Sequence, residues 1–303
     1  MEDEPTAADE VAAVEEDAPV VKEVNVEVFM DGLSRIDRVL DDSGYAFTAL
    51  DVVDKQLESL EPIKNYQHLL FVNVAKNQIS DPAPLAELPH LVVADLSENA
   101  LVSPFTLANE HLKWLDVEAT CCHIQALDVS GNQIPTLQGF QMASLSSLKI
   151  NGNQLESLAG VSSLPALTAL EASSNAIANL DALASEQLPK LEHLHLNGNQ
   201  LATVDGIENL QSLQLLSLTE NNIESLEAVS KFTDLPALQE LDLTGNPVTD
   251  VDNYRLDMIL LVPTLSKLDG VQITDDERLA AVDLRQQRED AAAAAEAAEN
   301  ADE

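Results

Sequence analysis

Apolar and polar residues alternate along this chain in short segments that return at a nearly constant interval. Leu191, Leu194 and Leu196 form one such segment, with polar residues between them and Asn199 three positions further on. Residues two apart in an extended chain face the same side, so each segment predicts a short strand with one buried face. The return of the segment indicates an internal repeat whose units bury their apolar faces against one another.

The repeat follows the pattern L-x-x-L-x-L-x-x-N-x-L, and Lys55 holds the asparagine position one repeat before the first asparagine. The asparagines are Asn77, Asn99, Asn132, Asn153, Asn175, Asn199, Asn221 and Asn246. This pattern predicts an α/β leucine-rich-repeat solenoid of the 22-residue class over 45–250, with about nine to ten coils. We expect a parallel sheet on the concave side and short helical or irregular segments on the convex side. The asparagine side chains should satisfy backbone groups of neighbouring coils.

The repeat is irregular at 103–131, because Asn99 and Asn132 lie about one and a half repeat lengths apart. The segment HLKWLDVEAT resembles a strand with Thr120 in the asparagine position, yet the chain from Thr120 to Asn132 spans only about half a repeat. That is too little chain to close a coil. Either the solenoid is distorted here or the sequence lacks part of one coil.

The terminal coils of a solenoid need covering, and apolar residues at helical spacing predict a capping helix over 26–44. They are Phe29, Leu33, Ile36 and Leu40, and Gly44 would end the helix. The segment 1–25 is rich in acids, Ala and Pro, so we expect an acidic disordered tail.

A second cap is predicted over 251–274, after the last repeat. Its covering residues would be Tyr254, Met258, Leu261 and Leu265. The remaining segment, 275–303, is acidic and rich in Ala, which predicts a solvent-exposed helix with a fraying end.

Charge limits the partners, because 53 acidic residues against 15 basic ones give a net charge of -38. Such a chain repels phosphate backbones and anionic lipid, so we expect neither nucleic acid nor membrane as a partner. The first residues, MEDEPTAADE, do not have the form of a signal peptide. Disulfide-rich caps, usual in secreted repeat proteins of this kind, are missing, which favours a cytoplasmic location.

Candidate chemistry is sparse, and we expect a protein that is not an enzyme and takes no cofactor or metal. His193 and His195 lie two apart, but a metal site would need a third ligand such as Glu171 or Asp242, so ordinary surface residues are favoured.

Cys121 and Cys122 are adjacent, which makes a disulfide between them strained. The carboxylates are typical of a solvated face, with weak calcium binding as the alternative.

Two rows of side chains should project from the concave face, six and four positions before each asparagine. In the N-terminal coils the rows hold Ala49, Phe71, Val93 and Trp114, and beside them Asp51, Asn73, Asp95 and Asp116. An exposed aromatic and apolar row flanked by carboxylates is typical of a protein-binding hot spot. The alternative is that Trp114 is tucked under the irregular coil. The C-terminal coils offer His193, His195, Leu215, Glu240 and Asp242.

The entry segment MDGLSRIDRVLDDSGYAFTALDVVDKQLESLEPIKNYQHLLFVNVAKNQISDPAPL and the exit segment NPVTDVDNYRLDMILLVPTLSKLD are distinctive. Together they resemble the family of leucine-rich-repeat-containing protein 23, a component of ciliary radial spokes, from about Phe29 to about Arg288. The departure lies at Cys121–Ile124, where the coil looks shorter than in the family.

The resemblance implies a non-catalytic structural subunit of the axonemal radial spoke, located in the cilium or flagellum, whose partners are neighbouring spoke subunits. Tubulin is itself acidic, so we do not expect direct tubulin contact to dominate. Two rival functions share the repeat class: a regulatory subunit of a protein phosphatase and a dynein-associated light chain.

Overall fold

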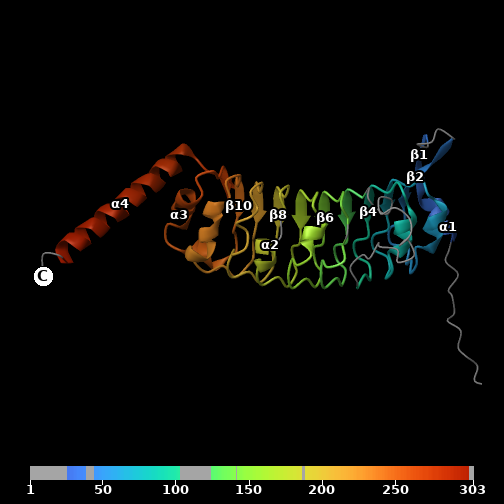
Figure 1. The fold of residues 1–303 in the computed structure, drawn as a ribbon, viewed down its shortest axis with the longest axis horizontal. Helices are drawn as coiled ribbons and strands as arrows, with labels where there is room; N and C mark the ends of the chain where they lie inside the picture. Colours follow the sequence, from blue (N-terminus) through green and yellow to red (C-terminus); the bar gives the residue numbers. More distant parts are fainter. Residues whose placement is uncertain (1–25, 39–43, 103–123, 141, 186–187, 300–303) are drawn as a thin grey trace, which may run out of the picture.

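The computed structural model describes residues 26–38, 44–102, 124–140, 142–185 and 188–299. Its strands form one 12-stranded sheet, in which each strand pairs with the next along the chain. The strands β2 to β11 run parallel, while β1 and β12 add antiparallel at the two ends. Figure 1 shows the coils stacked in one row, so the leucine-rich-repeat solenoid expected from the sequence is confirmed.

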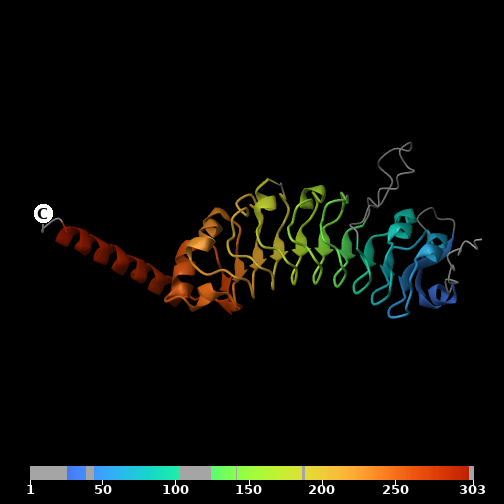
Figure 2. The ribbon, with the colours of Figure 1, turned by 90° about the horizontal axis from the view of Figure 1, so that it is seen from below.

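The strands are short, as the repeat pattern predicts. They are β1 (Leu33–Arg38), β2 (Tyr45–Asp51), β3 (Phe71–Asn73), β4 (Val93–Asp95), β5 (Ala126–Asp128), β6 (Ser147–Lys149), β7 (Ala169–Glu171), β8 (His193–His195), β9 (Leu215–Ser217), β10 (Glu240–Asp242), β11 (Lys267–Leu268) and β12 (Val271–Gln272). In Figure 2 the coils stand side by side, with the sheet on one side and the short helices on the other.

The convex side carries short helical segments, because each coil has only a few residues left to return to the next strand. They are the 3-10 helices η1 (Glu61–Asn65), η2 (Ala83–Glu87), η4 (Val161–Ser163), η5 (Glu227–Asp234) and η6 (Pro247–Asp250), and the α-helix α2 (Asp181–Ser185). Two α-helices lie beyond β10: α3 (Tyr254–Leu261) precedes β11, and α4 (Asp275–Glu299) follows β12.

The core is built from the apolar positions of the repeat. Leu191, Leu194 and Leu196 have no exposed surface, and the equivalent leucines and isoleucines of the other coils are buried in the same way. Burying one such side chain stabilises the fold by about 1.5–3 kcal/mol relative to leaving it in water. Because each coil supplies the same few positions, the core is a continuous stack of aliphatic side chains.

An asparagine ladder joins the coils on their turn side. The side-chain oxygen of each repeat asparagine accepts a hydrogen bond of 3.0–3.1 Å from a backbone N–H of the preceding coil. Its amide nitrogen donates to a carbonyl of that coil at 2.7–3.1 Å. Each asparagine therefore satisfies backbone groups that would otherwise be buried without partners.

The long coil between β4 and β5 does not interrupt the sheet. Val93 of β4 pairs directly with Ala126 of β5, in the same way that Phe71 of β3 pairs with Val93. The ladder also continues, since Asn132 accepts from the Leu101 N–H at 3.0 Å. The strand expected around Thr120 falls on residues 103–123, which lie outside the described part of the chain.

The helix expected over 26–44 forms only in its first two turns, and the prediction is wrong for residues 33–38, which form a strand. The helix α1 (Val26–Gly32) ends at Gly32, where an added Cβ would lie 2.5 Å from Val52 and 2.6 Å from the Asp51 carbonyl oxygen. The chain then forms β1, which pairs antiparallel with β2 and satisfies the backbone groups at that end of the sheet. Phe29 is fully buried, whereas Ile36 is 60% exposed, and Leu40 lies outside the described residues.

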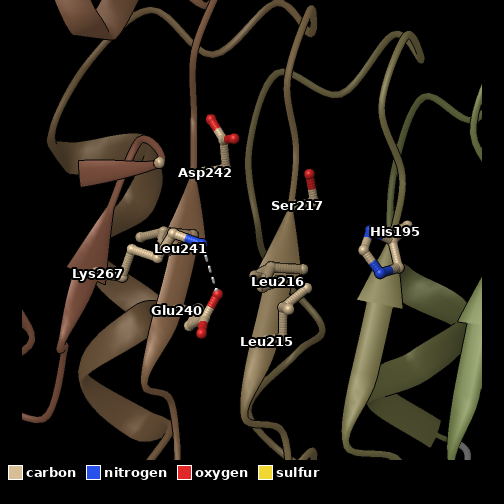
Figure 3. Close-up of a pocket in the computed structure, with 9 residues that line it drawn as sticks. His195, Leu215, Leu216, Ser217, Glu240, Leu241, Asp242 and Lys267 are labelled. Carbon is tan, nitrogen blue, oxygen red and sulfur yellow. Dashed lines mark hydrogen bonds and ion pairs between the residues drawn. The ribbon is translucent and has the colours of Figure 1, made fainter. Parts of the chain in front are cut away.

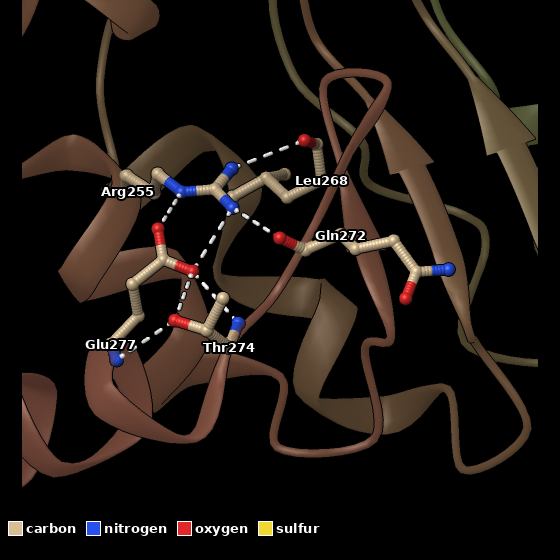
Figure 4. Close-up of polar contacts among 5 residues, drawn as sticks. All are labelled: Arg255, Leu268, Gln272, Thr274 and Glu277. Atoms are coloured by element: carbon tan, nitrogen blue, oxygen red, sulfur yellow. Dashed lines mark hydrogen bonds and ion pairs between the residues drawn. The ribbon is translucent and has the colours of Figure 1, made fainter.

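Arg255 ties the C-terminal cap together (Figure 4). Its guanidinium donates to Glu277 at 2.6 Å and to the carbonyl oxygens of Leu268 and Gln272 at 3.1 and 3.2 Å. Thr274 and Glu277 form a capping box at the start of α4, because each side chain accepts the other residue's backbone N–H. Tyr254 and Met258 of α3 are buried over the last coil.

The helix α4 then leaves the solenoid and projects away from the coils (Figure 1). Its first turns are held against α3, where Ala281 is fully buried and Arg288 pairs with Asp257. None of the helices that the structure describes is long and apolar enough to cross a membrane.

Candidate protein-binding surface

Two rows of side chains project from the concave face of the sheet. In the three-residue strands the middle residue is buried and the residues on either side belong to the opposite face, because side chains alternate along an extended chain. Most of these flanking residues are partly exposed, whereas Ser217 of β9 is only 8% exposed. Strand register aligns these flanking residues from coil to coil. The first row is Ala49, Phe71, Val93, Ala126, Ser147, Ala169, His193, Leu215, Glu240 and Lys267, and the second is Asp51, Asn73, Asp95, Asp128, Lys149, Glu171, His195, Ser217 and Asp242.

The N-terminal part of the first row is apolar, as expected, with Phe71 and Val93 half-buried. Arg35 of β1 lies over the Phe71 ring, with its guanidinium carbon 4.9 Å from the ring centroid. Ala126 stands next to Val93 in this row, because β5 pairs directly with β4. Trp114 and Asp116 lie outside the described residues.

The acidic residues of the second row are fixed by their own turns. Asp95 accepts the Ser97 N–H at 3.0 Å, and Asp128 accepts the Ser130 N–H at 2.9 Å. Asn73 makes the same contact with the Ala75 N–H at 3.2 Å. Each contact uses one oxygen of the side chain and holds that side chain at the edge of the concave face.

The middle coils present small residues in the first row, Ala126, Ser147 and Ala169, beside one ion pair in the second. Lys149 lies 3.0 Å from Glu171. Burial of Glu171 would raise its pKa, but hydrogen bonds from Lys149 and Asn151 outweigh burial and lower the pKa below its usual value. Glu171 is therefore a fully charged, paired carboxylate at neutral pH.

A hollow of about 160 Å³ lies at the C-terminal end of the concave face (Figure 3). It is lined by four of the expected residues and by five others: His195, Leu215, Glu240 and Asp242, with Leu216, Ser217, Leu241, Lys267 and Gly270. Lys267 pairs with Glu240 at 3.2 Å across the lower part of the hollow. The remaining expected residue, His193, is exposed on the strand that carries His195.

Metal binding by the histidine pair has no support in the described part of the chain, where no group of three or more His, Cys, Asp or Glu side chains could hold a metal ion. Burial lowers the pKa of His195, opposed by the nearby charge of Glu171. His195 is therefore neutral at pH 7.

Sequence reasoning did not single out Lys149 and Lys267, the two cations of this face. Lys149 stands four before Asn153, so the repeat template was enough to find it. Lys267 lies on the last parallel strand, where Ile273 stands in the position that the template gives to an asparagine, so the template gave no signal there.

These features define a leucine-rich-repeat protein, a scaffold of the protein-binding class. Family models described as leucine-rich repeat match residues 161–298 and 120–134. Leucine-rich repeat-containing protein 23 of Bos taurus is 30% identical, over 86% of this chain and 79% of that protein. The chain belongs to the leucine-rich repeat-containing protein 23 family.

Two further similarities are narrower. A segment of 49 residues, 16% of this chain and 21% of the relative, is 41% identical to the U2 small nuclear ribonucleoprotein A' of Candida albicans. An internalin (inlF) from Listeria monocytogenes has a similar solved structure, with a TM-score of 0.60, 24% identity and coverage of 75% of this chain and 62% of that chain. At this identity the internalin likeness concerns the fold alone.

Proposed function

We propose that this protein is a structural subunit of the axonemal radial spoke that holds neighbouring spoke subunits on its concave face and supports ciliary or flagellar motility. The chain belongs to the leucine-rich repeat-containing protein 23 family. The resemblance to that family implies a place in the radial spoke, which supports this role. The general class, a repeat scaffold that binds proteins, also fits the fold.

The observation that carries the proposal is the continuity of the concave face. The ten parallel strands are paired without a break, including at the long coil between β4 and β5. Nine spacings of about 4.8 Å give a face about 43 Å long. A partner helix of about 28 residues would span that length, so one partner segment can contact many coils at once.

Charge favours partners other than the microtubule surface. The chain carries a net charge of -38, and tubulin is also acidic, so direct contact between them would be repulsive. Other spoke subunits with basic or apolar surfaces fit the face better.

The test is the location of a tagged copy in ciliated cells before and after detergent extraction. The proposal expects the protein to stay with the axoneme and to be lost from it in a strain without radial spokes. Loss in a strain that lacks dynein arms but keeps its spokes would instead favour a dynein-associated light chain. A diffuse or nuclear signal, with a phosphatase catalytic subunit in the pull-down, would favour the phosphatase regulator.

A further inference from the structure

The C-terminal hollow offers an apolar floor with hydrogen-bond acceptors at one side. Leu215, half-buried, forms part of the floor between β8 and β10. Next to it, His195, Ser217 and Asp242 lie in one row across three neighbouring strands, because strand register pairs each with the next. Figure 3 shows Ser217 and Asp242 on adjacent strands beside this floor.

Two side chains of this row, Ser217 and Asp242, can each accept a further hydrogen bond. Ser217 donates its hydroxyl hydrogen to Asn197 at 2.7 Å, so its oxygen can accept a hydrogen bond from outside. Asp242 uses one carboxylate oxygen for the Thr244 N–H at 3.0 Å. Among the ion pairs of the described residues, Asp242 has none.

Cations near the hollow are held by other carboxylates. Lys267 pairs with Glu240, and Arg255 pairs with Glu277. Asp269 is half-buried directly after β11, the strand next to that of Asp242, and its pKa is raised first by burial and also by the charge of Asp242. The hollow therefore has an excess of negative charge that an incoming cation would relieve.

We propose that this hollow receives an arginine side chain of a protein partner. The aliphatic stem would lie on Leu215, and the guanidinium would donate to Asp242 and Ser217 at once. The two acceptors come from adjacent strands, which lie about 4.8 Å apart. Two separate acceptors suit the several N–H donors of a guanidinium better than the single centre of a lysine ammonium. Neutral His195 adds no opposing charge. The inference rests on the proposed binding role of the concave face and names the chemistry recognised there.

The test uses the full chain, labelled at leucine methyl groups, and a synthetic peptide, acetyl-Gly-Gly-Arg-Gly-Gly-amide. We expect saturable shifts of the Leu215 methyl signals with the arginine peptide and none with the same peptide carrying neutral citrulline. A lysine peptide should bind more weakly. Equal response to arginine and citrulline, equal binding of lysine, or no saturable shift at Leu215, would overturn the proposal.

Asp242→Asn removes the charge but keeps an oxygen for the Thr244 N–H, so the turn should stay intact. This variant should bind the arginine peptide with about fivefold lower affinity. The matched control is Asp234→Asn, the same change at an exposed position in η5, which should leave affinity unchanged. If both variants bind as the unaltered protein does, the hollow is not the site. The peptide assay measures binding at the hollow alone, so its failure would not contradict the axonemal location. Failure of the location test would likewise not contradict peptide binding at the hollow.

Discussion

Replacing Asn132 by alanine tests the ladder where it matters most, at the long coil. The Asn132 side chain is 6% exposed and accepts the Leu101 N–H at 3.0 Å. It also donates to the carbonyl oxygens of Leu96, Val129 and Ser130 at 3.1, 2.9 and 3.2 Å. Asn132→Ala leaves the Leu101 N–H without its acceptor, and a buried group that loses its partner costs about 1–3 kcal/mol. With the lost carbonyl contacts, we expect a loss of about 2–4 kcal/mol.

The assay is urea-induced unfolding followed by circular dichroism, together with hydrogen exchange at the Leu101 amide. Asn73→Ala is the control, because Asn73 is half-buried and accepts only the Ala75 N–H of its own turn, at 3.2 Å. That variant should lose no more than about 1 kcal/mol. A loss for Asn132→Ala no larger than for Asn73→Ala, with unchanged protection of Leu101, would refute the continuous ladder.

Two further predictions concern the C-terminal cap and a turn between β8 and β9. Hydrogen bonds from Arg255, and secondly from the Thr274 backbone, lower the pKa of Glu277 from 4.5 to about 2. A carboxylate with a lowered pKa in the folded state stabilises the fold above its unfolded pKa and loses that effect as pH falls through the folded value. Glu277→Gln should therefore cost about 1 kcal/mol at pH 7, after allowance for solvent screening, and the difference from the unaltered protein in thermal unfolding should shrink as pH falls from 4.5 through about 2. A difference as large at pH 2 as at pH 7 would contradict this assignment. Gly206→Ala should lower stability by more than about 2 kcal/mol, because φ is +102° and the new Cβ would overlap the Leu180 carbonyl oxygen. Gly270→Ala, with φ of +75° and open space around it, should cost less in the same unfolding assay, and equal losses would count against the steric argument.

The repeat was predictable because a solenoid uses the same few contacts in every coil. Leu194 is buried and Asn199 is hydrogen-bonded in the same way as the equivalent residues one coil away, so the sequence pattern alone predicts their burial and their hydrogen bonds. The C-terminal cap residues Tyr254 and Met258 were found from their spacing for a similar reason, since a covering helix has one buried face.

Sequence-based prediction failed where hydrogen bonding to a neighbouring strand outweighs the local spacing of apolar residues. Phe29 and Ile36 fit a helical period, but the open edge of β2 gives residues 33–38 a partner for their backbone groups. Trp114 fits the strand template but lies outside the described residues, while Ala126 stands next to Val93 in the sheet. The hollow depends on Lys267 and Ser217 of strands far apart in sequence, and only register brings them together.

The central claim is that the concave face holds this protein to its partners, and a pair of variants within one coil tests it. Ala169 stands in the middle of the concave face on β7, and Ala178 is exposed after that coil's turn. Tagged Ala169→Arg and Ala178→Arg would be expressed in ciliated cells lacking the endogenous protein, after circular dichroism has shown that both fold. We expect Ala178→Arg to stay with detergent-extracted axonemes and Ala169→Arg to be released from them. Equal retention of both variants would contradict the central claim.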